Sequence, residues 1–73
     1  MIELLWRDVS SSRIVAEAYD PETETIYVRF PSGVEWRYEG CPPDIWEAFS
    51  RDGQSRGAFI HEVLNYKSHG RHG

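Results

Sequence analysis

Residues 25–38 read TIYVRFPSGVEWRY, and this stretch decides the fold. Apolar and polar side chains alternate on both sides of its centre, with the period of two that half-buried strands require. The centre, Pro31 to Gly33, has the length and the glycine of a three-residue hairpin loop. The stretch therefore predicts two antiparallel strands, residues 25–30 and 34–38.

A further strand is expected upstream, over residues 14–19, where apolar Ile14, Ala16 and Ala18 recur at every second position. Residues 20–23, Asp-Pro-Glu-Thr, form a turn, because the aspartate can cap it and the proline sets φ at its second position. Two tight connections in succession predict an antiparallel meander of three strands.

Two amphipathic helices are expected after the sheet. Pro42 and Pro43 suit the first turn of the first helix, Gly53 is a natural stop, and Ser55 can cap the second helix. Their apolar stripes supply the layer that a three-stranded sheet with one apolar face needs. The predicted fold class is α+β, a three-stranded antiparallel meander packed on one face by two C-terminal helices (βββαα).

The expected core combines the inward side chains of the three strands with the apolar stripes of both helices. These residues are Ile14, Ala16, Ala18, Ile26, Val28, Phe30, Val34, Trp36, Tyr38, Ile45, Trp46, Phe49, Phe59, Ile60, Val63 and Leu64.

The chain has 73 residues, enough for one domain, which we place at residues 10–66. Residues 1–9 are too apolar to lie free in water, so we expect an extra strand or a segment packed on the core. Residues 67–73 carry no apolar side chain and are expected to be a disordered tail.

Composition excludes several classes of protein. Cys41 is the single cysteine, so no internal disulfide forms, and a small domain without disulfides is typical of a reducing compartment. The N-terminus lacks the pattern of a signal peptide, and no stretch approaches the ~20 apolar residues that span a bilayer. We therefore expect a cytoplasmic protein with no membrane partner.

The formal net charge is −4, and it is unevenly distributed. Residues 17–47 contain eight acidic and two basic residues, whereas residues 48–73 contain four basic and two acidic ones. Since nucleic-acid affinity depends largely on phosphate neutralisation, the acidic half is a poor nucleic-acid surface. A local basic patch is still possible at the helical end.

Five short motifs, in this order, resemble the KTSC domain family. They are Ser11-Ser12-Arg13-Ile14, Tyr19 to Thr23, Phe30 to Gly33, Trp36-Arg37-Tyr38 and, after Pro42, Ser55-Arg56-Gly57-Ala58-Phe59. The resemblance covers about Ser10 to Tyr66.

This family is named for its occurrence at the C-terminus of some lysyl-tRNA synthetases, and it also occurs as a small stand-alone bacterial protein. The resemblance implies the second form, and it implies the RNA-binding role that has been suggested for the family. The family's central motif is Tyr-x-Tyr, and Trp36 replaces its first tyrosine here. The replacement keeps the aromatic bulk and removes a phenol hydroxyl.

Trp36 and Tyr38 can act in two ways. Aromatic side chains on a sheet can stack on the bases of single-stranded nucleic acid. Alternatively both side chains point inward with Val34 and pack on the helices, which the alternation of the strand favours.

Tyr27, Arg29 and Arg37 are candidate binding residues on the opposite sheet face, because arginine beside tyrosine on a flat sheet can hold RNA. The alternative is a solvated face with cross-strand charge pairs, such as Arg29 with Glu17 or Glu35.

Arg51 and Arg56 are further candidates, because they flank the predicted helices and can form a basic patch there. A base at a helix end also complements the helix dipole, so Arg51 has a purely structural explanation as well.

Cys41 lacks the neighbouring base and the electropositive setting of a catalytic thiol, since residues 39–42 read Glu-Gly-Cys-Pro. His61 has no ligand-type residue four positions away, and three scattered histidines do not make a metal site. We therefore expect no catalytic residue, no metal and no cofactor.

Two functions remain open. The first is a non-enzymatic binding module whose partner is RNA or another protein. The second is a structural or oligomerising protein–protein interaction domain without a nucleic-acid ligand, in which a homodimer hides the apolar side chains of residues 2–6.

Overall fold

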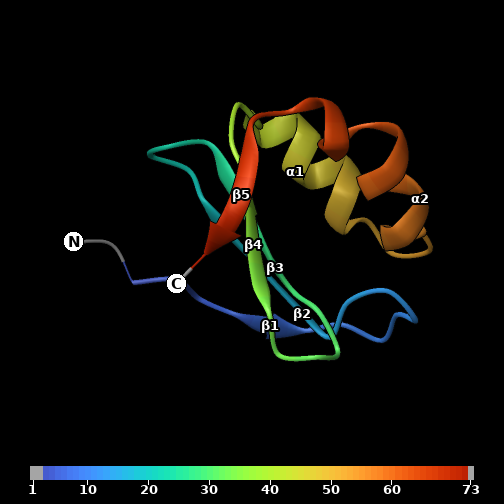
Figure 1. The fold of residues 1–73 in the computed structure, drawn as a ribbon. Coiled ribbons are helices and arrows are strands. Elements are labelled where there is room, and N and C mark those ends of the chain that lie inside the picture. The colour runs from blue at the N-terminus through green and yellow to red at the C-terminus, as the bar shows by residue number, and fades with distance from the viewer. Residues whose placement is uncertain (1–2, 73) are drawn as a thin grey trace.

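A computed structural model describes residues 3–72, which form a five-stranded antiparallel sheet with helices on one face (Figure 1). Met1, Ile2 and Gly73, included in the predictions for residues 1–9 and 67–73, lie outside the described residues. The elements are β1 (Arg7–Asp8), β2 (Ala16–Asp20), β3 (Thr25–Arg29), β4 (Glu35–Tyr38), α1 (Pro43–Ser50), α2 (Arg56–Glu62), a 3-10 helix (Leu64–Tyr66) and β5 (His69–His72). The α+β class and the two helices are confirmed, whereas the sheet has five strands and not three.

The strands follow one another in the sheet in the order of the sequence, β1-β2-β3-β4-β5. The turn before β3 forms as expected, because the Asp20 carboxylate accepts hydrogen bonds from the Glu22 N–H at 2.9 Å and the Thr23 hydroxyl at 2.8 Å. Gly33, with φ at +92°, supplies the left-handed position of the β3–β4 hairpin.

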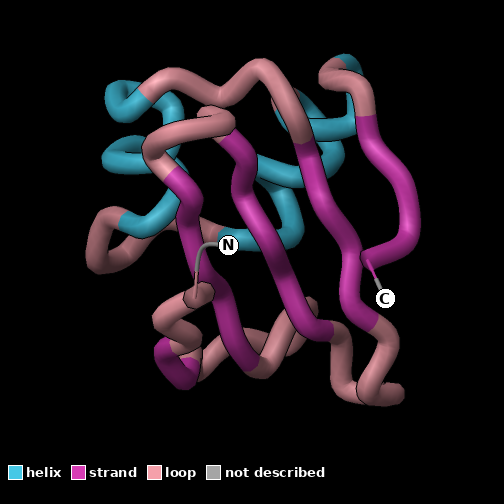
Figure 2. The backbone as a smooth tube through the Cα atoms, turned by 90° about the vertical axis from the view of Figure 1, so that its left-hand side faces the viewer, coloured by secondary structure: helices cyan, strands magenta, loops and turns pink. Residues whose placement is uncertain are grey.

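The helices cover one face of the sheet, as Figure 2 shows by placing the strands in front of them. Fully buried Phe49 of α1 and Ile60 of α2 pack in one cluster with Ile26 and Val28 of β3. The Ser55 hydroxyl caps α2 by accepting from the Ala58 N–H at 3.2 Å. No helix within residues 3–72 is long and apolar enough to cross a membrane.

The inward face of β2 differs from the prediction by one residue. Glu17 is the cross-strand partner of Val28, and Tyr19 is the partner of Ile26, so Glu17 and Tyr19 lie on the helix-covered face. Ala16 and Ala18, which were expected there, lie on the opposite face. The prediction of a solvated Glu17 is likewise wrong, because its side chain is completely buried.

A β-bulge at the start of β2 causes this change of phase. The Val15 N–H donates to the Arg29 carbonyl at 2.8 Å, while Ala16 is the cross-strand partner of Arg29. Two residues of one strand therefore oppose one residue of the other, and the alternation shifts by one position. Ile14 precedes the bulge and lies in the core as predicted.

Ala16 and Ala18 are nevertheless buried, at 1% exposure each, because the chain before β1 crosses their face. The Trp6 ring meets Tyr27 edge-on at 6.4 Å between ring centroids, and the Arg29 guanidinium lies 4.5 Å from the Trp6 centroid. Small side chains on β2 leave room for this indole.

β1 and β5 extend the sheet at its two edges. β1 lies within residues 1–9 and pairs with β2, with Arg7 opposite Glu17 and Asp8 opposite Ala16. Residues 69–72 form β5 along β4, so the prediction of a disordered tail is wrong for them. Backbone hydrogen bonds to β4 hold this strand, and such bonds leave no apolar pattern in the sequence.

Candidate functional site

The structure brings Tyr27, Arg29 and Arg37 together on the sheet face that faces away from the helices. Tyr27 and Arg37 are cross-strand partners, and Arg29 is two residues from Tyr27 along β3. Two aromatic side chains join them from segments that sequence reasoning did not place, Trp6 and His72. The His72 ring lies 4.7 Å from the Tyr27 ring. Only the apolar character of residues 1–9 signalled part of this cluster.

The arginines of this face are paired with acids. Arg29 Nε lies 2.8 Å from Glu35 Oε2, one of the two charge pairs that the sequence offered. Arg37 Nε lies 3.1 Å from Glu39 Oε2. The face therefore has little net attraction for phosphate.

Arg56 lies in a buried cluster and not in a surface patch. Its Nε is 2.9 Å from Glu17 Oε1, and its side chain is 11% exposed. Arg7 holds the other oxygen of the same carboxylate, with Nη2 at 2.7 Å from Oε2. Both arginines also donate to the Ser50 carbonyl at the end of α1, at 3.0 Å from Arg7 and 3.2 Å from Arg56.

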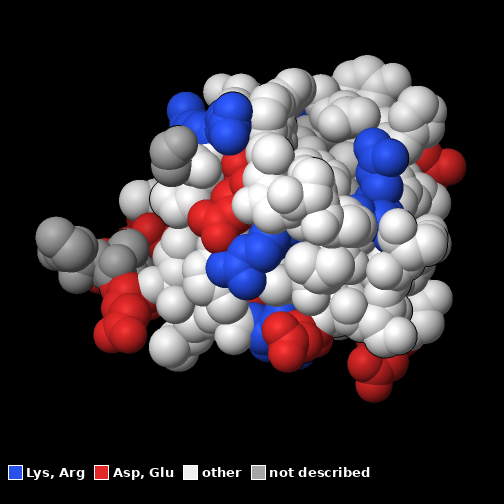
Figure 3. Space-filling model, turned by 60° about the horizontal axis from the view of Figure 1, so that its bottom comes forward, with Lys and Arg blue, Asp and Glu red and all other residues white. Residues whose placement is uncertain are grey.

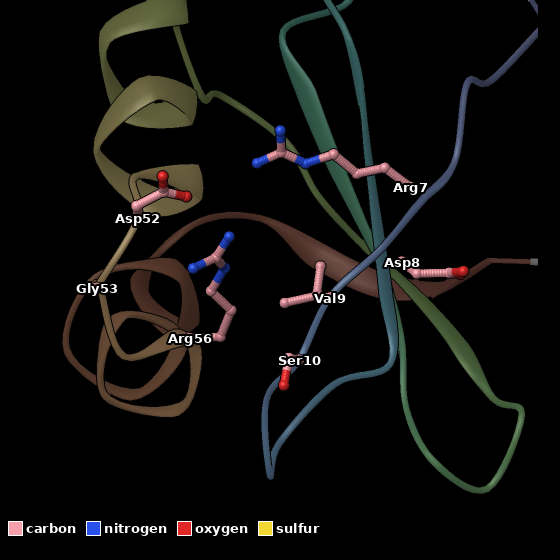
Figure 4. Close-up of a pocket in the computed structure, with 7 residues that line it drawn as sticks. All are labelled: Arg7, Asp8, Val9, Ser10, Asp52, Gly53 and Arg56. Carbon is pink, nitrogen blue, oxygen red and sulfur yellow. The ribbon is translucent and has the colours of Figure 1, made fainter.

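A hollow of about 340 Å³ adjoins this cluster, between the α1–α2 connection and the chain around β1 (Figure 4). Seven residues line it, namely Arg7, Asp8, Val9, Ser10, Asp52, Gly53 and Arg56. Its two guanidinium groups already bind Glu17, and Asp52 also lines it, so the hollow does not favour an anion.

Arg51, the remaining candidate, is exposed, and its backbone carbonyl accepts from Arg56 Nη1 at 3.3 Å. The structure therefore separates Arg51 from the sheet-face candidates. On the face drawn in Figure 3, lysines and arginines form separate spots and no continuous basic surface.

Cys41 is completely buried, with its Sγ 3.4 Å from the Tyr38 carbonyl. Burial raises the pKa of the Cys41 thiol, which disfavours the thiolate that a nucleophile needs. Tyr38 is 2% exposed and Trp36 packs against the core, as the inward interpretation of both aromatics predicts. Within residues 3–72 there is no group of three side chains able to hold a metal.

β5 forms an edge of the sheet, because its only neighbour within the described part of the chain is β4. In Figure 2 the strand runs along the right-hand side of the molecule. We define the β5 edge as the side of residues 69–72 that faces away from β4. The sequence did not predict this part of the candidate site.

A small antiparallel sheet backed by two helices, with the two-residue strand β1 at one edge and β5 at the other, defines a compact α+β domain built around a single core. The model of the KTSC domain family matches residues 10–71, and the chain belongs to this family.

A solved structure agrees with this assignment, and two relatives match most of this chain. An uncharacterized protein of Stutzerimonas stutzeri is 34% identical over 56 residues, which cover 77% of this chain and 78% of the relative. A protein of Tsukamurella paurometabola is 30% identical over 56 residues, 77% of this chain and 82% of the relative. The crystal structure of a KTSC domain protein from Yersinia pestis has a TM-score of 0.86 and 26% identity, covering 97% of this chain and all of that one.

Proposed function

We propose that the protein is a non-enzymatic interaction module that binds an extended segment of another protein through its sheet. The open edge of β5 carries this proposal. A free strand edge presents unpaired N–H and C=O groups, and such an edge is a template for pairing with another chain.

The charge distribution supports a protein partner over RNA. Arg29, Arg37 and Arg56 are each held by a carboxylate, so three of the candidate cations are already neutralised. RNA binding to a sheet needs cations that are available to phosphate.

RNA binding is a second candidate, favoured by the aromatic cluster of Trp6, Tyr27 and His72 on the sheet face. Such rings can stack on unpaired bases. Titration with a single-stranded RNA dodecamer at low and high salt measures this function. RNA binding that Tyr27→Ala removes would favour the second candidate.

Non-enzymatic action and a cytoplasmic location complete the proposal. The buried Cys41 supports the first, because its thiol is removed from solvent and from substrates. A single unpaired cysteine supports the second.

Selection from a random-peptide display library tests the proposed function. We expect enriched peptides that shift the amide NMR resonances of sheet residues and leave α2 unchanged. Enrichment no greater than for an empty support would contradict it. Sedimentation measurements then separate a partner-binding module from a self-associating domain.

A further inference from the structure

We propose that the outer edge of β5 receives an acidic, extended segment of a partner protein as a sixth strand. This inference rests on the proposed function and adds the place of binding and the chemistry of the partner. It depends on the backbone groups of β5, on the charge of the strand and on the position of Arg37.

The hydrogen-bond pattern decides which groups of β5 face outward. The Glu39 N–H donates to the Ser68 carbonyl at 2.7 Å, so these residues form a hydrogen-bonded pair in register with the β4–β5 ladder. Hydrogen-bonded and non-hydrogen-bonded pairs alternate in an antiparallel ladder. Gly70 and His72 therefore bond to β4, whereas the N–H and C=O groups of His69 and Arg71 point away from it.

These outward groups are two residues apart, as an incoming strand requires for pairing. A peptide supplies both donors and acceptors at this spacing. A nucleic-acid backbone supplies acceptors without the matching N–H donors, so the edge favours a protein segment over RNA.

The strand and its approach are basic. Residues 63–72 contain Lys67, His69, Arg71 and His72 and no acidic residue. Within residues 3–72, neither Lys67 nor Arg71 forms an ion pair. The acids beside the edge, Glu35 and Glu39, are already held by arginines.

An incoming strand therefore meets an arginine on each face of the sheet, Arg71 on the helix-covered face and Arg37 on the other. His69 and Arg71 lie on the helix-covered face, opposite Tyr38 and Trp36, and His72 lies on the other face, opposite Glu35. Acidic side chains complement this charge. A second copy of β5 would bring basic groups against basic groups, so self-pairing is disfavoured.

Arg37 covers the edge in the free protein. Its guanidinium lies across Gly70, where a Cβ atom would come within 3.2 Å of Nη2. Its Nη1 donates to the outward carbonyl of Arg71 at 2.5 Å. An incoming N–H takes over this carbonyl and frees Nη1 of Arg37 for a carboxylate of the partner, while Nε stays paired with Glu39. A segment without acids therefore gains less from displacing Arg37.

A pair of synthetic peptides tests the inference. The probe is an end-blocked peptide of alternating glutamate and valine, and its control carries lysine in place of glutamate. We expect the acidic peptide to shift the amide resonances of His69 and Arg71 and to bind at least about tenfold more tightly than its control. Shifts confined to other surfaces would overturn the inference.

Variants at Arg71 separate charge from backbone pairing. Arg71→Ala removes the charge and keeps the outward N–H, whereas Arg71→Pro removes both without touching the bonds to β4. We expect weaker acidic-peptide binding for the first and a further loss for the second. Arg71→Glu should reduce or reverse the preference between the two peptides. If circular dichroism shows that the Arg71→Pro variant does not fold, the peptide preference of Arg71→Glu alone decides the test.

Failure of this inference differs from failure of the proposed function. Library peptides that bind elsewhere on the sheet, or that carry no acidic bias, would overturn the acidic docking edge and leave the interaction module standing. A library that yields no binding peptide would overturn both. A dimer that forms through β5 in the absence of peptide would contradict the inference that an acidic partner segment binds this edge.

Discussion

Glu17 is a buried carboxylate held between two guanidinium groups. Its two oxygens accept from Arg7 and Arg56, and both arginines also bind the Ser50 carbonyl. The cluster thereby joins β1 and β2 to the end of α1 and the start of α2. A small domain has a limited apolar core, so such a polar link is a substantial part of its tertiary structure.

Removing the Glu17 carboxylate should destabilise the fold strongly. Glu17→Ala leaves the nearly buried Arg56 without its counter-charge, and loss of one partner of a buried pair costs about 3–5 kcal/mol. Urea denaturation followed by tryptophan fluorescence measures the free energy of unfolding. If the variant does not fold, Glu17→Gln keeps the side-chain volume and should still show a clear loss.

Glu35→Ala is the matched control, because it breaks the partly exposed pair with Arg29. Its cost should stay below about 1 kcal/mol. If Glu17→Ala and Glu35→Ala lower the free energy of unfolding equally, the buried cluster does not stabilise the fold more than a surface ion pair does.

Stability should fall at alkaline pH. Burial raises the pKa of Cys41 above 9.0 and that of Tyr38 above 10.0, the values expected for the exposed groups. As pH rises through these lower values, the unfolded chain loses protons that the folded protein keeps, so unfolding becomes more favourable. The loss should begin near pH 9 in urea denaturation curves.

Cys41→Ala serves as the control for this pH dependence. In this variant the loss of stability should begin at a higher pH, where tyrosine titrates. Ultraviolet absorbance measures the titration of tyrosine. Stability that stays constant from pH 7 to about pH 11 would contradict the burial of these ionisable groups.

Part of the candidate site was predictable at the residue scale. Alternation along residues 25–38 placed Tyr27, Arg29 and Arg37 on one face, as the structure has them. The pairing of Arg56 with Glu17 was not predictable, because 39 residues separate them and the β2 face depends on a bulge. The alternation of apolar and polar residues does not reveal a β-bulge, in which one extra residue shifts the side chains that follow to the other face.

At the scale of elements, β5 is the clearest difference between sequence and structure. β3, β4 and the two helices were predictable because their own residues carry alternation, stripes, prolines and a cap. β5 carries no such pattern, since its sequence is His-Gly-Arg-His and its pairing depends on the backbone of β4. Local patterns cannot predict a strand held in this way.

Two proline substitutions test the pairing of β5. Gly70→Pro removes an N–H that bonds to β4, and it should lower the free energy of unfolding by about 2 kcal/mol. Arg71→Pro removes an N–H that points outward and should cost less than about 1 kcal/mol. Thermal melts of the two variants compare them directly, and equal melting temperatures would refute the register of β5.

The cap of α2 permits a similar matched comparison. Ser55→Ala removes the hydroxyl that accepts from the Ala58 N–H, and it should cost about 1 kcal/mol. Ser12→Ala makes the same chemical change at an exposed side chain, without a hydrogen bond in the described structure, and should be close to neutral. A chemical denaturation series measures both, and a larger loss at Ser12 would contradict the capping role.

At the scale of the whole molecule, acidic and basic residues are concentrated in different parts of the chain. The protein is acidic overall, with a net charge of −4, yet β5 is basic. The acids of the sheet face are held by arginines of the same face. Within residues 3–72, the edge of β5 is therefore the place where outward-facing backbone groups lie beside the unpaired positive charge of Arg71.

Amide hydrogen exchange across β5 tests this arrangement most directly, first in the free protein and then with the acidic glutamate–valine peptide. We expect the Gly70 N–H to be protected in both states, while the N–H groups of His69 and Arg71 exchange rapidly alone and slowly with peptide. Rapid exchange of all three in both states would contradict the paired strand and its open edge.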